Sequence, residues 1–489
     1  MPSLATPRFY PWFLLSGFLF LACYAVRPSA GGGKAAGKGT RRIDPAAIAL
    51  PAGYRIEAFA TGLTYPTAVT FDDSGGVYAL EGGYAYGERW TEPRLLRVVR
   101  PNILTVVAAG DSNGPWTGVS YHQGAFYIAE GGQMRGGRIL KVTQPGKLVP
   151  MVEGLPSLGD HHTNGPAVGP DGMLYFGQGT ATNSAVVGED NFAFGWLPRF
   201  PEFHDRPCRD VVLSGVNYIS PNPLTKADDS AETGPYSPFG TRSTPGQVIK
   251  GELPCNGSVM RVPLAGGAPE LVAWGFRNPF ALAFSPQGKL YVLDNGYDER
   301  GSRPVWGTAD LLWEVVPGTW YGWPDYSGAK SLDRVEFKPP GEGNPALMLN
   351  TPPSQVPEAV AYLPVHSSAD GMDFSRNAAF GHEGQAFVAL FGDMAPSVGK
   401  VLEPVGFRVV RVDLQRKVVE DFALNRKSPH GPASQAGTGG LERPVSLKFS
   451  PDGKDLYVVD FGVMAMQGKK PQPRKETGVI WRIWKEPSP

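Results

Sequence analysis

The sequence predicts an all-β fold: a six-bladed β-propeller with loop insertions on one face. One strand–turn–strand signature recurs six times along the 489 residues, and repeats of this size are typical of propellers. The 63 glycines and 48 prolines follow no collagen-like period, so they indicate many short strands joined by turns. Hydrophobic residues make up 42% of the chain, which is enough for a buried core.

Each copy of the signature has an alternating apolar strand, a turn containing glycine, and a second strand. The turn requires glycine because a tight hairpin places a residue at positive φ, which other side chains resist. The six copies are Pro66–Gly83, Thr117–Gly132, Asn164–Thr180, Asn278–Gly296, Ser368–Asp393 and Arg443–Gly462.

A third strand is expected after most copies. The six expected segments are Leu95–Val99, Arg138–Val142, Ser258–Val262, Leu311–Val316, Arg408–Val412 and Val479–Ile483. The first three copies begin 51 and 47 residues apart, which fits a four-stranded blade. Later spacings are longer and predict insertions, the largest over residues 188–252. We expect the propeller to occupy residues 49–486, with Gly53–Ala60 completing the last blade and closing the ring.

The N-terminus carries an export signal. The apolar run Trp12–Val26 suits the h-region of a signal peptide and is short for a spanning helix, which needs about 20 residues. Residues 1–30 are therefore a signal peptide cleaved near Ala30 or a retained membrane anchor, and both alternatives stay open. Cys23 is interpreted as an apolar residue of this leader, with a lipidated cysteine as the alternative. Residues 31–48, rich in glycine, alanine and lysine at their start, predict a flexible linker.

The two remaining cysteines predict a disulfide. Cys208 and Cys255 lie in similar Pro-Cys contexts at the two ends of a polar loop. An exported protein reaches a periplasmic or cell-envelope compartment, where such a pair is oxidised. Two buried free thiols are the alternative.

The charge composition argues against nucleic acid and an acidic membrane surface as partners. Lys and Arg number 46 and Asp and Glu number 46, so the formal net charge is zero. Neither a basic groove for nucleic acid nor a polybasic membrane patch is indicated.

Polar residues occupy one common register ahead of the turn glycines. Eleven residues before the glycine lie Asn113 in the second copy, His161 in the third and Arg277 in the fourth, with Asn278 beside it. Ten residues before the glycine in the sixth copy lies Arg443. Equivalent positions in propeller blades face the same axis, so we expect these side chains to meet at one mouth of the channel. Capping of loops is the alternative for each of them.

These residue types suit recognition and oxidation of a polar ligand. Arginine presents a planar fork for carboxylate or quinone oxygens. A neutral histidine accepts a hydroxyl proton near neutral pH, and either Asp160 or a backbone carbonyl would fix the tautomer of His161.

The chain resembles the soluble pyrroloquinoline quinone (PQQ)-dependent glucose dehydrogenases and the wider glucose/sorbosone dehydrogenase family. The resemblance lies in DHHTNGPAVGPDGMLYF (160–176), WGFRNPFALAFSPQGKLYVLDNGYDERGSRP (274–304), WYGWPDY (320–326) and RPVSLKFSPDGKDLYVVD (443–460). It extends over roughly residues 50–484 and is strong only in these four stretches.

The resemblance implies a site, residue by residue. The family's catalytic base falls on His161, with its neighbour His162 as the alternative, and Arg277 stabilises developing charge. The carbonyl oxygens that bind the cofactor's calcium ion fall on Gly296 and Tyr297, and oxygen ligands suit such a hard cation. The cofactor contacts fall on Asn113, Arg277, Asn278, Arg443 and, in the expanded fifth copy, Lys400.

Two positions depart from the family pattern. Asn113 stands where the glucose dehydrogenases have a glutamine, and Val445 stands where they have a second arginine.

The implied function is PQQ- and calcium-dependent oxidation of a sugar or aldehyde. The histidine base takes a hydroxyl proton while hydride passes to the quinone. The implied partners are the small-molecule substrate and an electron acceptor such as a cytochrome or a quinone. Two alternatives from other classes are a calcium-dependent lactonase and a non-enzymatic propeller that binds a partner or a glycan in the cell envelope.

Overall fold

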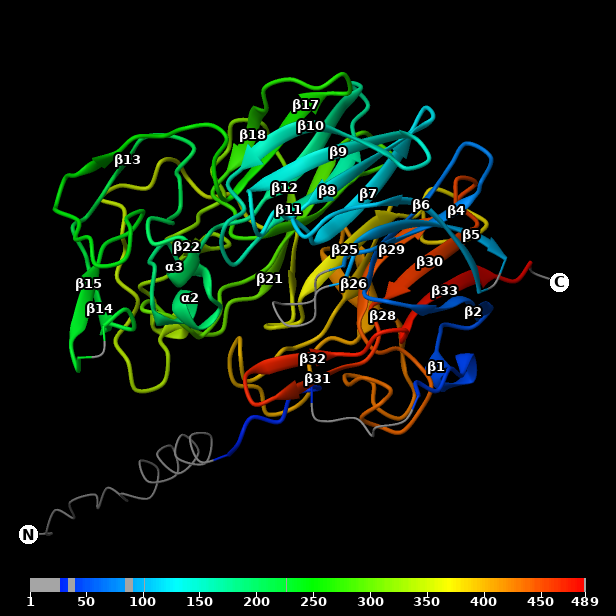
Figure 1. Cartoon of the computed structure of the whole chain (residues 1–489). Coiled ribbons are helices and arrows are strands. Elements are labelled where there is room, and N and C mark those ends of the chain that lie inside the picture. Colours follow the sequence, from blue (N-terminus) through cyan, green and yellow to red (C-terminus); the bar gives the residue numbers. More distant parts are fainter. Residues whose placement is uncertain (1–26, 34–39, 84–90, 101, 226, 488–489) are drawn as a thin grey trace, which may run out of the picture.

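The computed structural model describes residues 27–33, 40–83, 91–100, 102–225 and 227–487. Its described residues form six main β-sheets arranged around an axis, so the predicted six-bladed propeller is confirmed (Figure 1). The leader up to residue 26, including Cys23, lies outside the described residues. Among the residues with described structure, no helix has the length and apolarity needed to cross a bilayer.

The first three blades follow one another along the chain. The first contains β3 (Pro66–Phe71), β4 (Val77–Glu81), β5 (Arg94–Arg100) and β6 (Ile103–Ala109). The second contains β7 (Trp116–His122), β8 (Ala125–Glu130), β9 (Gly137–Gln144) and β10 (Lys147–Leu155). The third contains β11 (Thr163–Val168), β12 (Met173–Gln178), β17 (Ser258–Pro263) and β18 (Glu270–Trp274).

Of the last three blades, the fifth and the sixth each include a strand from the start of the described propeller. The fourth contains β19 (Pro279–Phe284), β20 (Leu290–Asp294), β21 (Asp310–Glu314) and β24 (Ala361–Leu363). The fifth contains β25 (Ala369–Phe374), β26 (Ala386–Leu390), β27 (Arg408–Asp413), β28 (Val418–Asn425) and β1 (Ile48–Ala49). The sixth contains β29 (Pro444–Phe449), β30 (Asp455–Asp460), β33 (Gly478–Lys485) and β2 (Tyr54–Leu63).

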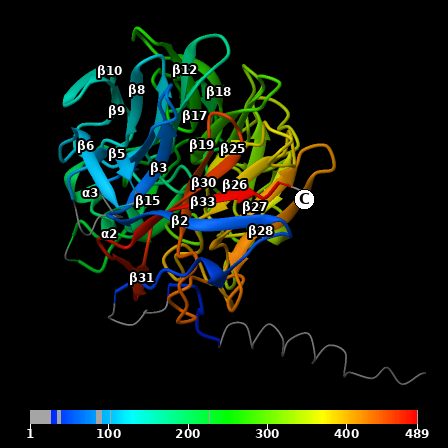
Figure 2. The ribbon, with the colours of Figure 1, turned by 90° about the vertical axis from the view of Figure 1, so that its right-hand side faces the viewer.

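The ring closes as the sequence predicts. Strand β2, from the start of the described propeller, pairs antiparallel with β33 near its end, from Tyr54 opposite Lys485 to Leu63 opposite Gly478. Figure 2 shows the two strands side by side. Because the last blade uses strands from both ends of the propeller, neither end can separate without breaking a sheet.

An acidic side chain at the end of the second strand fixes the loop before the innermost strand. The Asp294 carboxylate accepts hydrogen bonds from the backbone amides of Arg277 (3.0 Å) and Asn278 (2.7 Å). The Asp460 carboxylate likewise accepts from the amide of Arg443 (2.9 Å). In both blades a buried carboxylate binds the backbone just before the innermost strand. The residues there consequently occupy equivalent positions in their blades.

The largest insertion joins β12 to β17. Its elements are α2 (Glu189–Ala193), α3 (Trp196–Arg199), β13 (Val211–Val212), β14 (Tyr218–Pro221), β15 (Ser230–Thr233) and β16 (Val248–Ile249). The predicted disulfide between Cys208 and Cys255 is present, with 5.1 Å between the two Cα atoms. It ties Cys208, which lies between α3 and β13, to the residues that lead into β17.

Shorter elements lie outside the blades. They are η1 (Pro45–Ala47), β22 (Tyr326–Ser327), β23 (Lys330–Ser331), η2 (Val335–Phe337), β31 (Met464–Gln467) and β32 (Lys470–Pro473).

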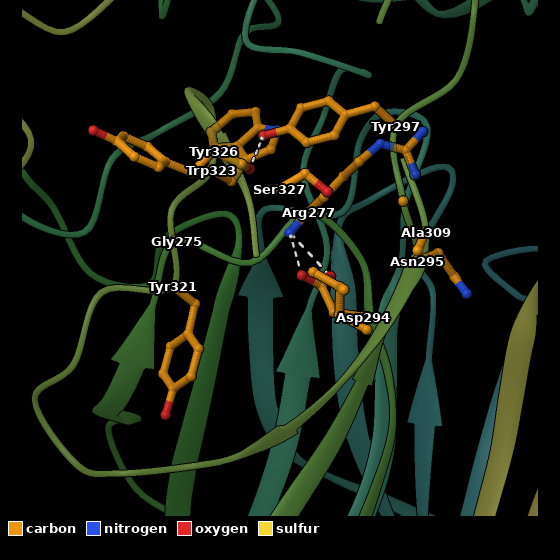
Figure 3. Close-up of a pocket in the computed structure, with 12 residues that line it drawn as sticks. Gly275, Arg277, Asp294, Asn295, Tyr297, Ala309, Tyr321, Trp323, Tyr326 and Ser327 are labelled. Atoms are coloured by element: carbon orange, nitrogen blue, oxygen red, sulfur yellow. Dashed lines mark hydrogen bonds between the residues drawn. The ribbon is translucent and has the colours of Figure 1, made fainter. Parts of the chain in front are cut away.

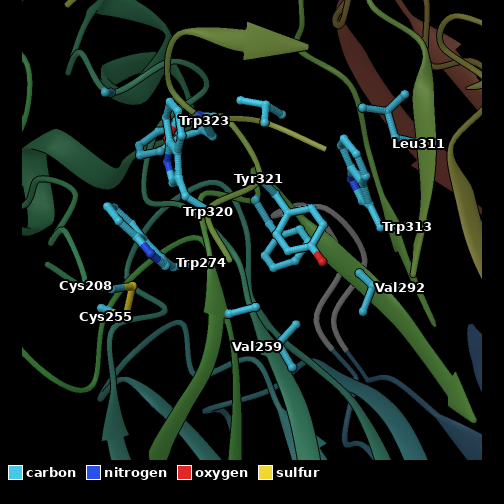
Figure 4. Close-up of a cluster of buried hydrophobic side chains, with 14 of the residues drawn as sticks. Cys208, Cys255, Val259, Trp274, Val292, Leu311, Trp313, Trp320, Tyr321 and Trp323 are labelled. Atoms are coloured by element: carbon cyan, nitrogen blue, oxygen red, sulfur yellow. A yellow bond between two sulfur atoms is a disulfide. The ribbon is translucent and has the colours of Figure 1, made fainter. Parts of the chain in front are cut away.

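The disulfide borders an aromatic cluster that supports the third and fourth blades (Figure 4). Trp313 and Trp320 are each 1% exposed. The ring of Tyr321 stacks on Phe276, with centroids 4.4 Å apart, and meets Trp313 edge-on at 5.0 Å. Such contacts add to the hydrophobic stabilisation of the loop that precedes β19.

The described residues of the predicted linker pack against the propeller. The amide of Gly32 donates to the buried Asp393 carboxylate at 3.0 Å, and the amide of Met466 donates to the Gly33 carbonyl. Further along, Arg41 forms an ion pair with Asp460, and both side chains are buried. Glycine and alanine are flexible in isolation, but here their small size allows the chain to approach the propeller closely.

Replacement of Gly32 by valine is expected to lower the free energy of unfolding. A Cβ atom at this position would lie 2.2 Å from the Phe407 ring, so the segment or the ring must move, at a cost of about 1–3 kcal/mol. Urea unfolding of the full chain measures the change. Gly343→Ala is the matched control, because a Cβ there meets nothing within 4 Å. Equal stability of the Gly32 variant and the wild type would contradict docking of this segment.

Candidate active site

The structure brings His161, Arg277 and Asn278 together where the third and fourth blades meet. His161 precedes β11, and Arg277 and Asn278 directly precede β19. The amide of Thr180 donates to the Arg277 carbonyl at 2.9 Å, which joins the two blades at this point. All three side chains are at most 9% exposed.

His161 is held in a defined tautomer. Its Nδ1 atom lies 2.9 Å from the carbonyl oxygen of Thr180, which only accepts hydrogen bonds, so Nδ1 carries the proton. Nε2 is then the lone-pair nitrogen. Burial, together with the charges of Arg277 and Arg300, lowers the pKa of His161 well below its usual value. The ring is therefore neutral at neutral pH and keeps an accepting nitrogen.

Of the two orienting groups considered from the sequence, the backbone carbonyl fixes the ring. Asp160 instead accepts hydrogen bonds from Arg300 at 2.7 Å and from Asn191 at 3.1 Å.

His162 has a different environment. Its Cγ atom is 2.9 Å from where a Cβ on Gly131 would lie, so the ring packs closely on the loop after β8. Burial lowers the pKa of His162 to about 4.

Arg277 has one edge of its guanidinium engaged. Nη2 donates to Asp298 at 2.7 Å and to Asn183 at 2.9 Å, and Nε donates to Asn183 at 3.2 Å. Nη1 makes no hydrogen bond with any residue that the structure describes. Arg277 lines a small pocket with Gly296 and Tyr297 (Figure 3). The arginine is thus positioned by the protein while retaining donor capacity.

A second arginine, Arg300, whose side chain is 12% exposed, was not predicted from the sequence. Its guanidinium pairs with Asp160 (2.7 Å), Asp190 (2.5 Å) and Asp298 (3.0 Å). Burial raises the pKa of Asp160 to about 6 despite the attraction of Arg300. Although burial opposes it, Arg277 and Arg300 hold the pKa of Asp298 below its usual range. The sequence signal for this cluster was the charged stretch Asp-Glu-Arg at 298–300, directly after the fourth copy. Only the fold shows which carboxylates Arg300 contacts.

The side chain of Asn113, which is predicted to contact the cofactor, forms four hydrogen bonds within the fold. Its Nδ2 donates to Glu130 (2.6 Å) and to the Gly136 carbonyl (3.0 Å). Its Oδ1 accepts from the amides of Met134 and Arg135. An asparagine side chain makes about four hydrogen bonds, so no donor or acceptor is left for a ligand.

Arg443 is also integrated into the fold. Its guanidinium lies between the rings of Phe391 (4.8 Å) and Phe407 (4.9 Å) and donates to the carbonyls of Gly392 and Asp393. The residue is 1% exposed. Arg443, which aligns with the family's cofactor-binding arginine, thus forms buried cation–π contacts where the fifth and sixth blades meet.

The proposed calcium carbonyls follow the end of β20. The Gly296 amide donates to Asp310 at 2.8 Å, and the Tyr297 carbonyl accepts from the Thr308 hydroxyl at 3.2 Å. A Cβ on Gly296 would lie 2.7 Å from the carbonyl oxygens of Thr308 and Ala309, so this turn is rich in oxygen atoms. Over the described ranges, no three His, Cys, Asp or Glu side chains gather as a metal cluster.

Lys400 lies on a loop that reaches the same region. Its backbone amide donates to Glu299 at 3.1 Å, and the other carboxylate oxygen of Glu299 is 3.3 Å from His366 Nε2. The expanded fifth copy therefore contacts the segment that carries Asp298 and Arg300.

A chain of side-chain amides crosses three blades beside the site. Asn164 Nδ2 donates to Asn278 (3.0 Å), Asn278 donates to Asn295 (2.8 Å), and Asn295 donates to Asp370 (3.3 Å). Sequence reasoning identified only Asn278, although Asn164 opens the third copy and Asp370 lies in the fifth. Burial raises the pKa of Asp370 to about 7.

The large insertion positions His161 through Asp205. The Asp205 carboxylate accepts from the Ala181 amide (2.6 Å) and the Thr182 hydroxyl (2.5 Å), directly after the Thr180 carbonyl that orients the histidine. Burial raises the pKa of Asp205 to about 7.

Stability is expected to depend on the protonation of Asp205. Between pH 4 and pH 7 the folded protein keeps this proton while the unfolded chain has lost it, so the free energy of unfolding falls as pH rises through this window. The Asp205→Asn variant has no carboxyl group to titrate at this position. Between pH 5 and pH 8 the free energy of unfolding should therefore fall by about 3 kcal/mol more in the wild type than in the variant. Urea unfolding at both pH values measures the difference, with the exposed Asp228→Asn as the control. If the free energy of unfolding depends on pH in the same way in the wild type and in Asp205→Asn, the prediction is wrong.

The fold and these contacts define a six-bladed propeller with a neutral histidine and a buried arginine at a blade junction. No family model matches the chain. A stretch of 186 residues is 26% identical to quinoprotein glucose dehydrogenase B from Acinetobacter calcoaceticus; it spans 38% of this chain and 30% of that protein.

Several solved structures share the fold of this chain. The holo PQQ domain of pyranose dehydrogenase from Coprinopsis cinerea superposes with a TM-score of 0.54 and 15% identity, covering 91% of this chain and 98% of that one. A calcium-containing family AA12 protein from Trichoderma reesei gives 0.53 and 14%, covering 92% and 100%. PQQ-bound aldose sugar dehydrogenase from Streptomyces coelicolor gives 0.50 and 17%, covering 90% and 100%. The predicted resemblance to the soluble PQQ-dependent glucose dehydrogenases is confirmed, and the chain has their propeller fold.

Proposed function

We propose that this protein is a PQQ- and calcium-dependent dehydrogenase that oxidises a sugar or an aldehyde. The observation that carries the proposal is the pairing of a neutral His161, oriented by Thr180, with Arg277, whose Nη1 remains available beside the turn at Gly296 and Tyr297. The matching fold of PQQ-containing dehydrogenases supports it.

The residues present fit the quinone and cation part of the cofactor. Arg277 supplies a guanidinium edge for a quinone oxygen or carboxylate, and the carbonyl oxygens of Gly296 and Tyr297 are ligands that calcium prefers. Asn278 and Lys400 are the remaining candidates for contacts. Asn113 and Arg443 are committed to the fold, so the cofactor's carboxylates would depend on fewer cationic partners than the motifs alone indicate.

In the proposed reaction, bound PQQ supplies a two-electron acceptor for hydride from the substrate carbon. His161 Nε2 accepts the proton of the reacting hydroxyl, because Nδ1 is already committed to Thr180. Arg277 donates to the oxygen on which negative charge develops, and Asp298 and Asn183 keep its guanidinium in place. His162 is the alternative base.

Export to the periplasm or the cell envelope, with a cytochrome or a quinone as the electron acceptor, completes the proposal. The disulfide between Cys208 and Cys255 supports an oxidising compartment.

Reconstitution tests this function. Addition of PQQ and Ca²⁺ to the purified full chain should change the absorbance spectrum and produce dye-linked oxidation of aldoses or aldehydes. Chelation of calcium should abolish the activity, and restored calcium should recover it. If neither the spectrum nor the activity responds to PQQ and Ca²⁺, the proposal is wrong.

The two alternatives from the sequence have less support. Of the amide oxygens that a lactonase would need as ligands, those of Asn278 and Asn295 already accept hydrogen bonds from neighbouring amides. A binding protein without catalysis would not need the orienting contact on His161.

A further inference from the structure

A second cavity lies away from the His161 site, between the outer strands of the fourth and fifth blades. It has a volume of about 520 Å³, within the range of about 300–1,000 Å³ that is usual for small-molecule sites. Its lining comes from β24, β27, β28 and the loop after β28: Tyr362, Leu363, Pro364, Val365, Arg408, Val410, Val419, Asp421 and His430. Most of the lining is aliphatic or aromatic, and besides the Tyr362 hydroxyl the polar side-chain groups come from Arg408, Asp421 and His430.

Arg408 is the buried polar group of this cavity. It is 9% exposed, although it lies on an outer strand of its blade. Its Nη1 donates to His430 Nδ1 at 2.6 Å and lies 3.2 Å from an Asp421 carboxylate oxygen. Its Nε is buried without a hydrogen bond, and Nη2 forms none with the described residues. Nε is therefore an unsatisfied buried donor, which is costly, whereas Nη2 is not buried and can meet a ligand.

The ion pair with Asp421 does not compensate the buried charge fully. Burial lowers the pKa of Arg408 even though Asp421 opposes the shift. The Asp421 side chain is 45% exposed, so solvent weakens its attraction. His430 accepts from Arg408 through Nδ1, which leaves its own proton on Nε2. The polar end of the cavity thus offers donors, and an acceptor carrying negative charge would complete it.

The charge and the lining define the ligand. A carboxylate matches the planar guanidinium edge, and the valine, leucine and proline side chains match an apolar body. A second negative charge on the ligand would approach Asp421, so a single carboxylate is favoured over a di- or tricarboxylate.

We propose that the cavity at Arg408 binds a small monocarboxylate with an apolar chain, as a site separate from the proposed catalytic centre. The carboxylate binds the free edge of Arg408, and the chain packs on Leu363, Val410 and Val419.

Binding of hexanoate to the purified full chain tests the proposal, measured by isothermal titration calorimetry in a buffer without carboxylates. Hexanoate should bind saturably to the wild type, whereas hexanamide, which has the same chain without the charge, should not. Arg408→Met should weaken hexanoate binding about 10- to 100-fold, because it removes a charged hydrogen bond.

Two further variants separate the site from general effects on folding. Val419→Phe fills the cavity from a half-buried position and leaves the guanidinium intact, so it should also weaken binding. Arg411→Met is the matched control, since Arg411 is on the same strand, pairs with Glu420, and does not line the cavity. No saturable binding to the wild type, equal binding of hexanamide, or unchanged affinity in both Arg408→Met and Val419→Phe would overturn the proposal. None of these results depends on PQQ.

Discussion

Replacement of His161 by asparagine is expected to lower kcat of dye-linked sugar oxidation about 100- to 10,000-fold, the range usual for loss of a general base. Asparagine can keep a hydrogen bond to the Thr180 carbonyl but offers no basic nitrogen in place of Nε2. Because the side chain is smaller and still polar, we expect the fold and the PQQ absorbance change to persist. Steady-state kinetics of the reconstituted enzyme, together with a PQQ titration, measure the two effects separately.

Two histidine variants serve as comparisons. His162→Asn should cause a smaller loss, because the His162 ring packs on the loop at Gly131. His122→Asn, at the far end of β7, is the control for loss of an imidazole outside the site. A large loss in His162→Asn with near-normal turnover in His161→Asn would assign the base to His162 and refute the assignment made here.

Removal of the disulfide is expected to have the largest effect on stability. The bond joins residues 47 positions apart, and its loss should lower the free energy of unfolding by about 4 kcal/mol, because the unfolded chain regains the entropy of that loop. Urea unfolding of Cys208→Ser/Cys255→Ser against the oxidised wild type measures this change. Reduced wild type should match the variant.

The same variant should also lower activity. Asn256, next to Cys255, donates to the Gly179 carbonyl at 3.0 Å, and Asp205, near Cys208, holds the Ala181 amide. Both contacts support the segment that carries Thr180, so a looser insertion should orient His161 less well. A stability loss below about 1 kcal/mol, set against the expected 4, would show that the insertion is held by its other contacts.

Much of the fold was predictable from the sequence because its signals are local. Each glycine turn between two apolar strands forms within about 20 residues, and the spacing of the copies then gives the number of blades. The closing strand was predictable as well, since Gly53–Ala60 had no other partner in the repeat pattern, and β2 pairs with β33. The disulfide followed from two similar contexts in an exported chain.

The candidate site was predictable only in part. The common register correctly brought out His161, Arg277 and Asn278 as neighbours, because equivalent loops are fixed by carboxylates such as Asp294. The same register also selected Asn113 and Arg443, whose side chains form several contacts inside the fold. Register gives the place of a residue in its blade, but it does not give the partners its side chain meets.

The sequence by itself determined the blade number, the closure of the ring and the positions from which side chains can reach the channel mouth, because these depend on local periodicity. Only the tertiary structure decided which of those side chains keep hydrogen-bonding groups available for a ligand. Arg300, Asp205 and Asp298 come from insertions without a repeat, and the partners of a buried charge are set by distances between segments far apart in the chain. The tight packing of Gly32 on Phe407 has the same origin: a glycine-rich composition is compatible with both a flexible tether and a docked segment, and only the surface that the segment meets distinguishes them.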